Sequence, residues 1–133
     1  MTTFARVPYP DAEGITEDLI RAVVVEFYRR VRLDEEIGPI FDAHVENWDI
    51  HLSRMADFWS SILLWSGRYT GKPMVRHRAI PELAYGHFDR WIELFEATLR
   101  DLCAAREAEV FLARALRMRE AMIKVLRLDG SQF

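Results

Sequence analysis

Apolar residues recur every three or four positions along most of the chain, which is the spacing of one face of an α-helix. No stretch shows the sustained apolar and polar alternation of a half-buried strand. The pattern therefore predicts an all-α protein with four substantial helices and one short segment between prolines.

The first helix is predicted to begin at Thr16, because a threonine hydroxyl is a good N-cap. Glu17 and Asp18 follow in the first turn, where the helix dipole favours acidic side chains. We expect this helix to run to about Val31. Its predicted buried face consists of Leu19, Ala22, Val23, Val24, Phe27 and Val31.

A break is predicted over Asp34 to Asp42, because Gly38-Pro39 interrupts helices. The second long helix then opens at Asn47 or Asp49 and ends near Trp65, where a glycine follows two residues later. Its apolar positions step by three and four: Trp48, Leu52, Met55, Trp59 and Ile62.

The second half of the chain contains two further long helices. A turn that follows Gly67 and contains Gly71 covers 68–72, and a short segment lies between Pro73 and Pro81. The third long helix is predicted from about Glu82 to Ala105 and the fourth from about Glu107 to Leu128. The predicted core positions are Phe88, Trp91, Leu94, Phe95, Leu99 and Leu102 in the third helix, and Val110, Leu112, Ala113, Leu116, Met122, Ile123 and Leu126 in the fourth.

Composition is typical of one globular domain of 133 residues, with 50% hydrophobic and 29% charged side chains. A net charge of −3 argues against a nucleic-acid partner. No apolar run approaches the roughly 20 residues of a membrane span, and the first residues lack the apolar core of a signal peptide. We therefore expect a cytoplasmic protein with an irregular arm over 1–14 and a single domain over 15–133.

The residues that could carry chemistry match no common catalytic motif. The four histidines are His44, His51, His77 and His87, and none follows a glutamate by three residues, which excludes the usual di-iron bundle. The zinc-protease pattern His-Glu-x-x-His and the covalent-haem pattern Cys-x-x-Cys-His are both absent. A lone Cys103 is more often a small buried residue than a nucleophile.

Two histidines stand out by their context. His51 shares a helix face with Met55 and Phe58, although such a histidine is more often part of the core than a ligand. His77 lies between two arginines inside the Pro73–Pro81 segment, where a surface position is the more common role.

Several segments, taken in order, resemble group III truncated haemoglobins from about residue 15 to residue 128. The resemblance rests on Phe27-Tyr28-Arg29-Arg30-Val31-Arg32, Ile37-Gly38-Pro39-Ile40-Phe41, Trp48-Asp49-Ile50-His51-Leu52, Phe58-Trp59, Gly67-Arg68-Tyr69-Thr70-Gly71-Lys72-Pro73-Met74, His77, and His87-Phe88-Asp89-Arg90-Trp91. It implies a truncated globin fold, in which a helical sandwich surrounds a haem pocket.

The resemblance also implies roles for single residues. His77 would be the proximal ligand of the iron in a haem b. Tyr28, His51 and Trp91 would lie on the distal side, where a bound ligand is stabilised. The remaining implied haem contacts are Phe41, Met55, Phe58, Arg76 and Arg78, and the two arginines would pair with the propionates or remain solvated surface charges. Arg68, Tyr69 and Lys72 are further candidates near the haem edge.

Three functions follow as alternatives. The leading expectation is a haem protein that reversibly binds O2, carbon monoxide or nitric oxide. The second is a haem redox enzyme that acts on nitric oxide or peroxide and uses a reductase. The third is a haem-free helical interaction module. A monomer or weak dimer is expected, with no nucleic-acid or membrane partner.

Overall fold

The computed structural model describes residues 14–69 and 85–128. Within these ranges the chain is helical and contains no strand. The helices are α1 (Glu17–Leu33), α2 (Gly38–His44), α3 (Trp48–Leu64), α5 (Tyr85–Leu102) and α6 (Ala105–Leu128). The all-α prediction is confirmed, while the predicted arm over 1–14, apart from Gly14, and the Pro73–Pro81 segment lie outside the described residues.

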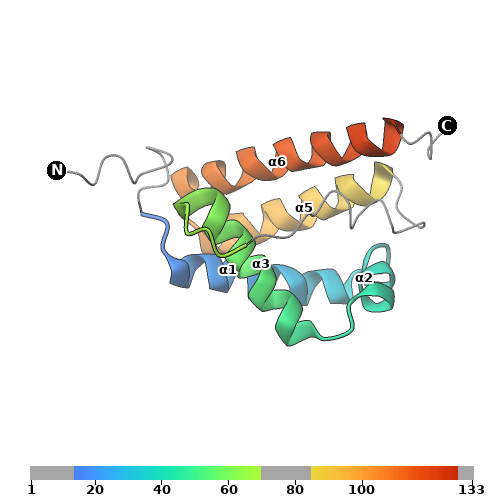
Figure 1. Cartoon of the computed structure of the whole chain (residues 1–133), viewed down its shortest axis with the longest axis horizontal. Coiled ribbons are helices and arrows are strands. Elements are labelled where there is room, and N and C mark those ends of the chain that lie inside the picture. Colours follow the sequence, from blue (N-terminus) through green and yellow to red (C-terminus); the bar gives the residue numbers. More distant parts are fainter. Residues whose placement is uncertain (1–13, 70–84, 129–133) are drawn as a thin grey trace.

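The helices form two layers (Figure 1). The long helices α5 and α6 lie side by side, and α1 and α3 cross each other beneath them. Helix α1 contacts α2, α3 and α5, so it connects the two layers. No helix in the described part of the chain is both long and apolar enough to cross a membrane.

Helix α1 begins as predicted, because Thr16 Oγ1 accepts a hydrogen bond of 3.1 Å from the Leu19 amide. The predicted face needs correction, since Ala22 is exposed and Leu19 only half-buried, whereas Ile20 and Tyr28 are buried. Helix α1 contacts α2, α3 and α5. The residues that are buried along α1 therefore differ from the single face that the spacing alone predicts.

Gly38-Pro39 does more than break a helix, because it opens α2. Proline is well suited to the first turn, where its missing amide hydrogen costs nothing. A Cβ on Gly38 would lie 2.9 Å from the carbonyl oxygen of Val31, so only glycine allows α2 to start this close to the end of α1.

Helix α3 starts and ends where the sequence predicts. Asn47 Oδ1 accepts a hydrogen bond of 3.1 Å from the Ile50 amide, which caps the first turn. At the other end Trp65 takes a left-handed conformation with φ of 56°, and Gly67 also has a positive φ of 76°. The chain therefore leaves the helix through a left-handed tryptophan, before it reaches the expected glycine.

The boundary and core of the last two helices differ from the prediction. Helix α5 ends at Leu102 rather than near Ala105, and Ala105 begins α6. Leu102 and Leu116 are 40% and 41% exposed, and Ala113 is also exposed. The residues of α6 that are buried instead are Ala108, Phe111 and Ala115. Two alanines with one phenylalanine allow α6 to approach α5 closely while a single large ring fills the space between the layers.

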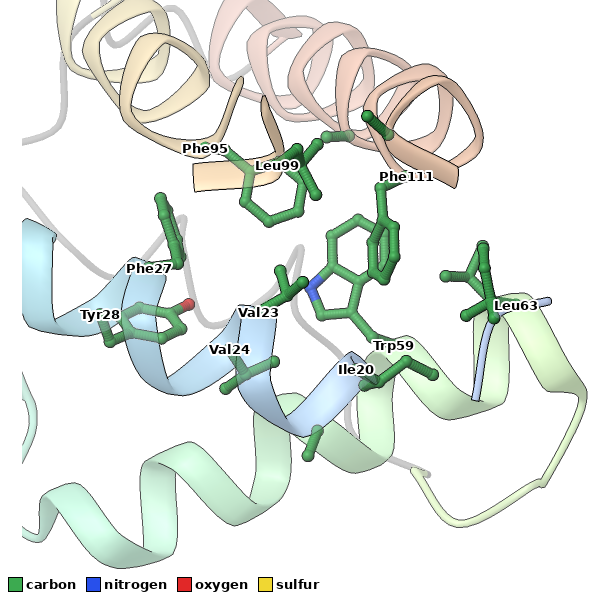
Figure 2. Close-up of a cluster of buried hydrophobic side chains, with 14 of the residues drawn as sticks. Ile20, Val23, Val24, Phe27, Tyr28, Trp59, Leu63, Phe95, Leu99 and Phe111 are labelled. Atoms are coloured by element: carbon green, nitrogen blue, oxygen red, sulfur yellow. The ribbon is translucent and has the colours of Figure 1, made fainter. Parts of the chain in front are cut away.

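An aromatic core joins the layers. Phe95 on α5 stacks on Trp59 of α3, with ring centroids 5.2 Å apart and an interplanar angle of 19°. Phe111 of α6 lies 5.5 Å from the same indole. Figure 2 shows these rings facing the aliphatic side chains of α1, including Val23. Because aromatic rings bury large areas, they supply much of the contact between the layers.

Truncating Phe111 should be costly, because its ring is fully buried. We expect Phe111→Ala to lower the free energy of unfolding by about 3–5 kcal/mol, measured by urea denaturation. The control is Leu33→Ala, at a side chain that is 73% exposed, which should change the free energy by no more than about 0.5 kcal/mol. Equal effects of the two substitutions would contradict the described core.

Candidate functional site

The structure brings two of the predicted distal residues together with Phe41, a predicted haem contact. Tyr28 lies on α1, Phe41 on α2 and His51 on α3. The Tyr28 and His51 rings meet edge to face with centroids 4.9 Å apart at 84°, and the Phe41 ring lies 5.7 Å from Tyr28. Three helices that are separate in the sequence therefore converge on the Tyr28 ring.

Trp91 of α5 reaches this group through Phe27 of α1. Its ring meets Phe27 edge to face with centroids 5.6 Å apart, and the Phe27 ring lies 4.8 Å from that of Tyr28. The phenol ring is buried, with 6% of the residue exposed.

Burial also fixes the protonation state of Tyr28. Loss of water raises the pKa of its hydroxyl well above the ordinary value, and the Trp91 side chain lowers the pKa by a smaller amount. At neutral pH the side chain is therefore an uncharged phenol that can donate a hydrogen bond.

Trp48 belongs to the same aromatic group, although the sequence placed it only on the helix face. Its ring centroid lies 5.4 Å from that of His51 and 6.0 Å from that of Tyr28. The guanidinium carbon of Arg32 lies 4.5 Å from the Trp48 ring, in position for a cation–π contact. The available signal was spacing, because a residue three positions before His51 lies on the same side of the helix.

Met55 and Phe58 continue the α3 face beyond His51, one and two turns along the helix. Both are half-buried and pack against the hydrophobic core. Phe58 also meets the ring of Tyr69 edge to face, with centroids 5.1 Å apart. The structure thus places these two predicted contacts on the expected face.

Five large side chains of this region share one property: each packs against the core while part of it stays exposed. They are Phe41, Trp48, Met55, Phe58 and Trp91. The Nε2 atom of His51 is buried at the same face. A surface made of rings, a thioether and a few nitrogen and oxygen donors fits a flat apolar ligand such as a porphyrin.

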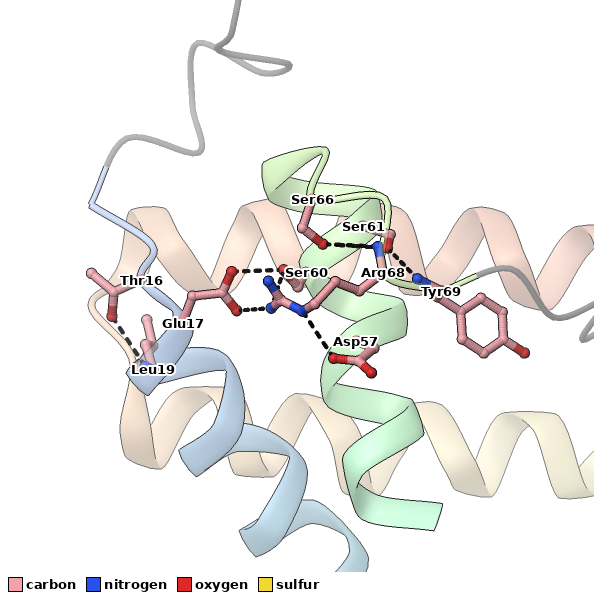
Figure 3. A network of polar contacts seen from close by, with 9 residues as sticks. All are labelled: Thr16, Glu17, Leu19, Asp57, Ser60, Ser61, Ser66, Arg68 and Tyr69. Carbon is pink, nitrogen blue, oxygen red and sulfur yellow. Dashed lines mark hydrogen bonds and ion pairs between the residues drawn. The ribbon is translucent and has the colours of Figure 1, made fainter. Parts of the chain in front are cut away.

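Arg68, a candidate near the haem edge, has its guanidinium bound to side chains of α1 and α3 (Figure 3). It donates to Glu17 Oε1 at 2.6 Å and to Asp57 Oδ1 at 3.0 Å. It also donates to the buried Ser60 Oγ at 2.9 Å, and Ser60 in turn donates to Glu17 Oε2 at 2.8 Å. These contacts connect the end of α3 to the start of α1 and raise the pKa of Arg68.

The predicted iron ligand and its neighbours are not among the described residues. His77, Arg76, Arg78 and Lys72 all lie within 70–84. Their roles therefore stay predictions.

Comparison with known proteins identifies the family. A model of the bacterial-like globins matches residues 11–124. This chain belongs to the bacterial-like globin family. Its resemblance to group III truncated haemoglobins is confirmed as well, because the globin is 33% identical to the group 3 truncated haemoglobin of Campylobacter jejuni over 107 residues, or 77% of this chain and 84% of that protein.

Solved structures agree with this assignment. The globin superimposes on the group III truncated haemoglobin of Campylobacter jejuni with a TM-score of 0.82 and 30% identity, covering 86% of this chain and 93% of the other. For the Fe(III) form of a truncated haemoglobin mutant from Tetrahymena pyriformis, the TM-score is 0.65 and the identity 28%, with 83% and 91% of the two chains covered. The truncated globin fold predicted from the sequence is therefore confirmed.

Burial of Tyr28 gives this globin a measurable titration property. In the native haem-free protein, Tyr28→Phe should leave the tyrosinate absorbance gained between about pH 9 and about pH 11 unchanged, because the wild-type Tyr28 does not ionise in that range. The same comparison in urea should show the loss of one titrating tyrosine. A native difference of one tyrosine would show that Tyr28 is in contact with water.

Proposed function

We propose that this globin binds a haem and, at the haem iron, reversibly binds O2 or another diatomic ligand. The observation that carries the proposal is the buried Tyr28 side chain, whose ring lies in edge-to-face contact with the ring of His51. A neutral donor enclosed by aromatic rings is suited to a small ligand that gains negative charge on binding.

The haem is proposed to be of the b type, held without covalent bonds, because the chain has one cysteine and no Cys-x-x-Cys-His pattern. His77 is the proposed proximal ligand, with Arg76 and Arg78 pairing with the propionates. Phe41, together with Met55 and Phe58, would supply the apolar surface for the porphyrin. The half-buried state of these three side chains supports this part of the proposal.

The haem iron would supply the open coordination position at which a diatomic ligand binds. The protein supplies the surroundings of that position. Tyr28 and Trp91 would each donate a hydrogen bond to the bound ligand, and the rings of Phe41 and His51 would enclose the Tyr28 side chain. In a pocket of low polarity such a hydrogen bond is stronger than it would be in water.

His51 is proposed to lie on the distal side without being a permanent iron ligand. Its contacts with Tyr28 and Trp48 support this place. An imidazole beside the ligand also supports the second function, in which the globin acts on nitric oxide or peroxide with His51 as a proton donor. That function needs electrons from a reductase, so turnover with an added electron donor would distinguish it from reversible binding.

A cytoplasmic location and a monomeric or weakly dimeric state are part of the same proposal. They rest on the sequence, which has a single cysteine and no predicted membrane span.

Replacing the proposed proximal ligand should remove most haem. We expect His77→Ala to lose haem during gel filtration, because the iron–imidazole bond is absent. The matched control is His44→Ala, at an exposed residue of α2, which should retain haem. Full retention with an unchanged visible spectrum in His77→Ala would refute the assignment.

Loss of either distal donor should accelerate ligand release. Tyr28→Phe and Trp91→Phe should each weaken O2 binding by about 1–3 kcal/mol, or roughly 5- to 150-fold, chiefly through faster dissociation in stopped-flow measurements. Carbon monoxide is the control ligand, since it gains less charge and should respond less. O2 dissociation within about twofold of wild type in both variants would assign these residues to the core alone.

A further inference from the structure

A half-buried ion pair lies at the corner between α1 and α2. The Asp34 side chain is 5% exposed and that of Arg90 is 37% exposed; Asp34 Oδ1 accepts from Arg90 Nε at 2.8 Å and lies 2.7 Å from Arg90 Nη2. Its Oδ2 accepts from the amides of Glu36 and Ile37, each at 3.0 Å. Both carboxylate oxygens are therefore bonded. The bonds to Arg90 and to the two amides hold the pKa of Asp34 below its usual value, although burial opposes them.

The backbone of Asp34 organises the same corner. Its amide donates to the Val31 carbonyl at 3.0 Å, which ends α1, and its own carbonyl accepts from the Gly38 amide at 3.0 Å, where α2 begins. Ile37 between them is buried in the core. One residue therefore sets how α2, which carries Phe41, leaves α1.

Arg90 lies on α5 directly before Trp91. The two side chains leave the same helical turn, and Arg90 Nη1 also donates to Glu93 at 3.1 Å one turn further on. Trp91 stacks on Phe95 with an interplanar angle of 9° and meets Phe27 of α1 edge to face at 5.6 Å. The ion pair thus fixes this turn of α5 against the end of α1.

We propose that Asp34 and Arg90 form a positioning pair, which holds the turn of α5 carrying Trp91 in register with α1 and so fixes the Trp91 indole against Phe27, next to Tyr28. On the proposed function, the pair determines how firmly a bound diatomic ligand is retained. A partly exposed ion pair contributes little net stability, so its defined geometry is the property that matters here.

A second ion pair on α5 provides a matched control. Arg100 Nη2 lies 2.7 Å from Glu96 Oε2, and their side chains are 57% and 42% exposed. Arg100→Gln removes the same charge from the same helix, within one exposed pair that makes no link between helices.

The first measurement uses the haem-free protein, so that it does not depend on the proposed function. Hydrogen exchange of the Trp91 indole N–H is followed by NMR in wild type, Arg90→Gln and Arg100→Gln. We expect exchange to be roughly 3- to 30-fold faster in Arg90→Gln and unchanged in Arg100→Gln, with Arg90→Lys in between because it keeps the charge but loses the two-pronged geometry. Equal exchange in wild type and Arg90→Gln would overturn the proposal.

Should Arg90→Gln fail to fold, Asp34→Asn replaces it. The amide oxygen can still accept from the amides of Glu36 and Ile37, while the charge that faces Arg90 is removed. Unchanged indole exchange in folded Asp34→Asn likewise overturns the proposal.

The second measurement uses the haem-loaded protein. Arg90→Gln should raise the O2 dissociation rate roughly 3- to 30-fold, and this factor should shrink towards one in the Trp91→Phe background, because the pair acts through that indole. An equal factor in both backgrounds would show a merely structural role and overturn the proposal. Failure to bind haem at all would refute the proposed function, while the indole exchange would still decide on the positioning pair.

Discussion

The stack of Trp59, Phe95 and Trp91 is the interaction on which both the fold and the site depend. Phe95 lies between the two indoles, 5.2 Å from one and 5.5 Å from the other, and its own side chain is almost completely buried. Through Trp59 the stack holds α3 against α5, and through Trp91 it sets the position of the indole N–H. The same packing that joins the layers thereby places a hydrogen-bond donor beside Tyr28.

Tyr28 is a polar group placed among apolar side chains. Its ring is enclosed by those of Phe27, Phe41 and His51, and 6% of the residue is exposed. Burial raises the pKa of its hydroxyl well above the ordinary value, so the group is held as a neutral phenol. Under the proposed function, this phenol is the donor that α1 presents to a small ligand.

The proposed haem contacts differ from the core of this globin in their burial. Val23 and Phe111 are completely enclosed by the protein. Phe41 and Met55 instead pack on the core and remain partly exposed. Partly exposed side chains of this kind remain able to contact a ligand, whereas enclosed side chains contact only protein.

The sequence by itself was sufficient for the class of fold and for the caps at Thr16 and Asn47. Caps and helical periods depend on neighbouring residues, so they can be read locally. The distal roles of Tyr28, His51 and Trp91 come from the family resemblance and stay predictions, as does the role of His77; the structure brings the Tyr28 and His51 rings into contact.

Only the tertiary structure decided which apolar positions are buried and which polar groups are paired. Leu116 and Phe111 are both apolar residues suited to a buried helix face. In α6, however, Phe111 packs against Trp59, whereas Leu116 is 41% exposed. Asp34 and Arg90 are 56 positions apart, and no local rule pairs them. Burial and long-range pairing depend on the angle at which helices cross, and that angle results from all their side chains packing at once.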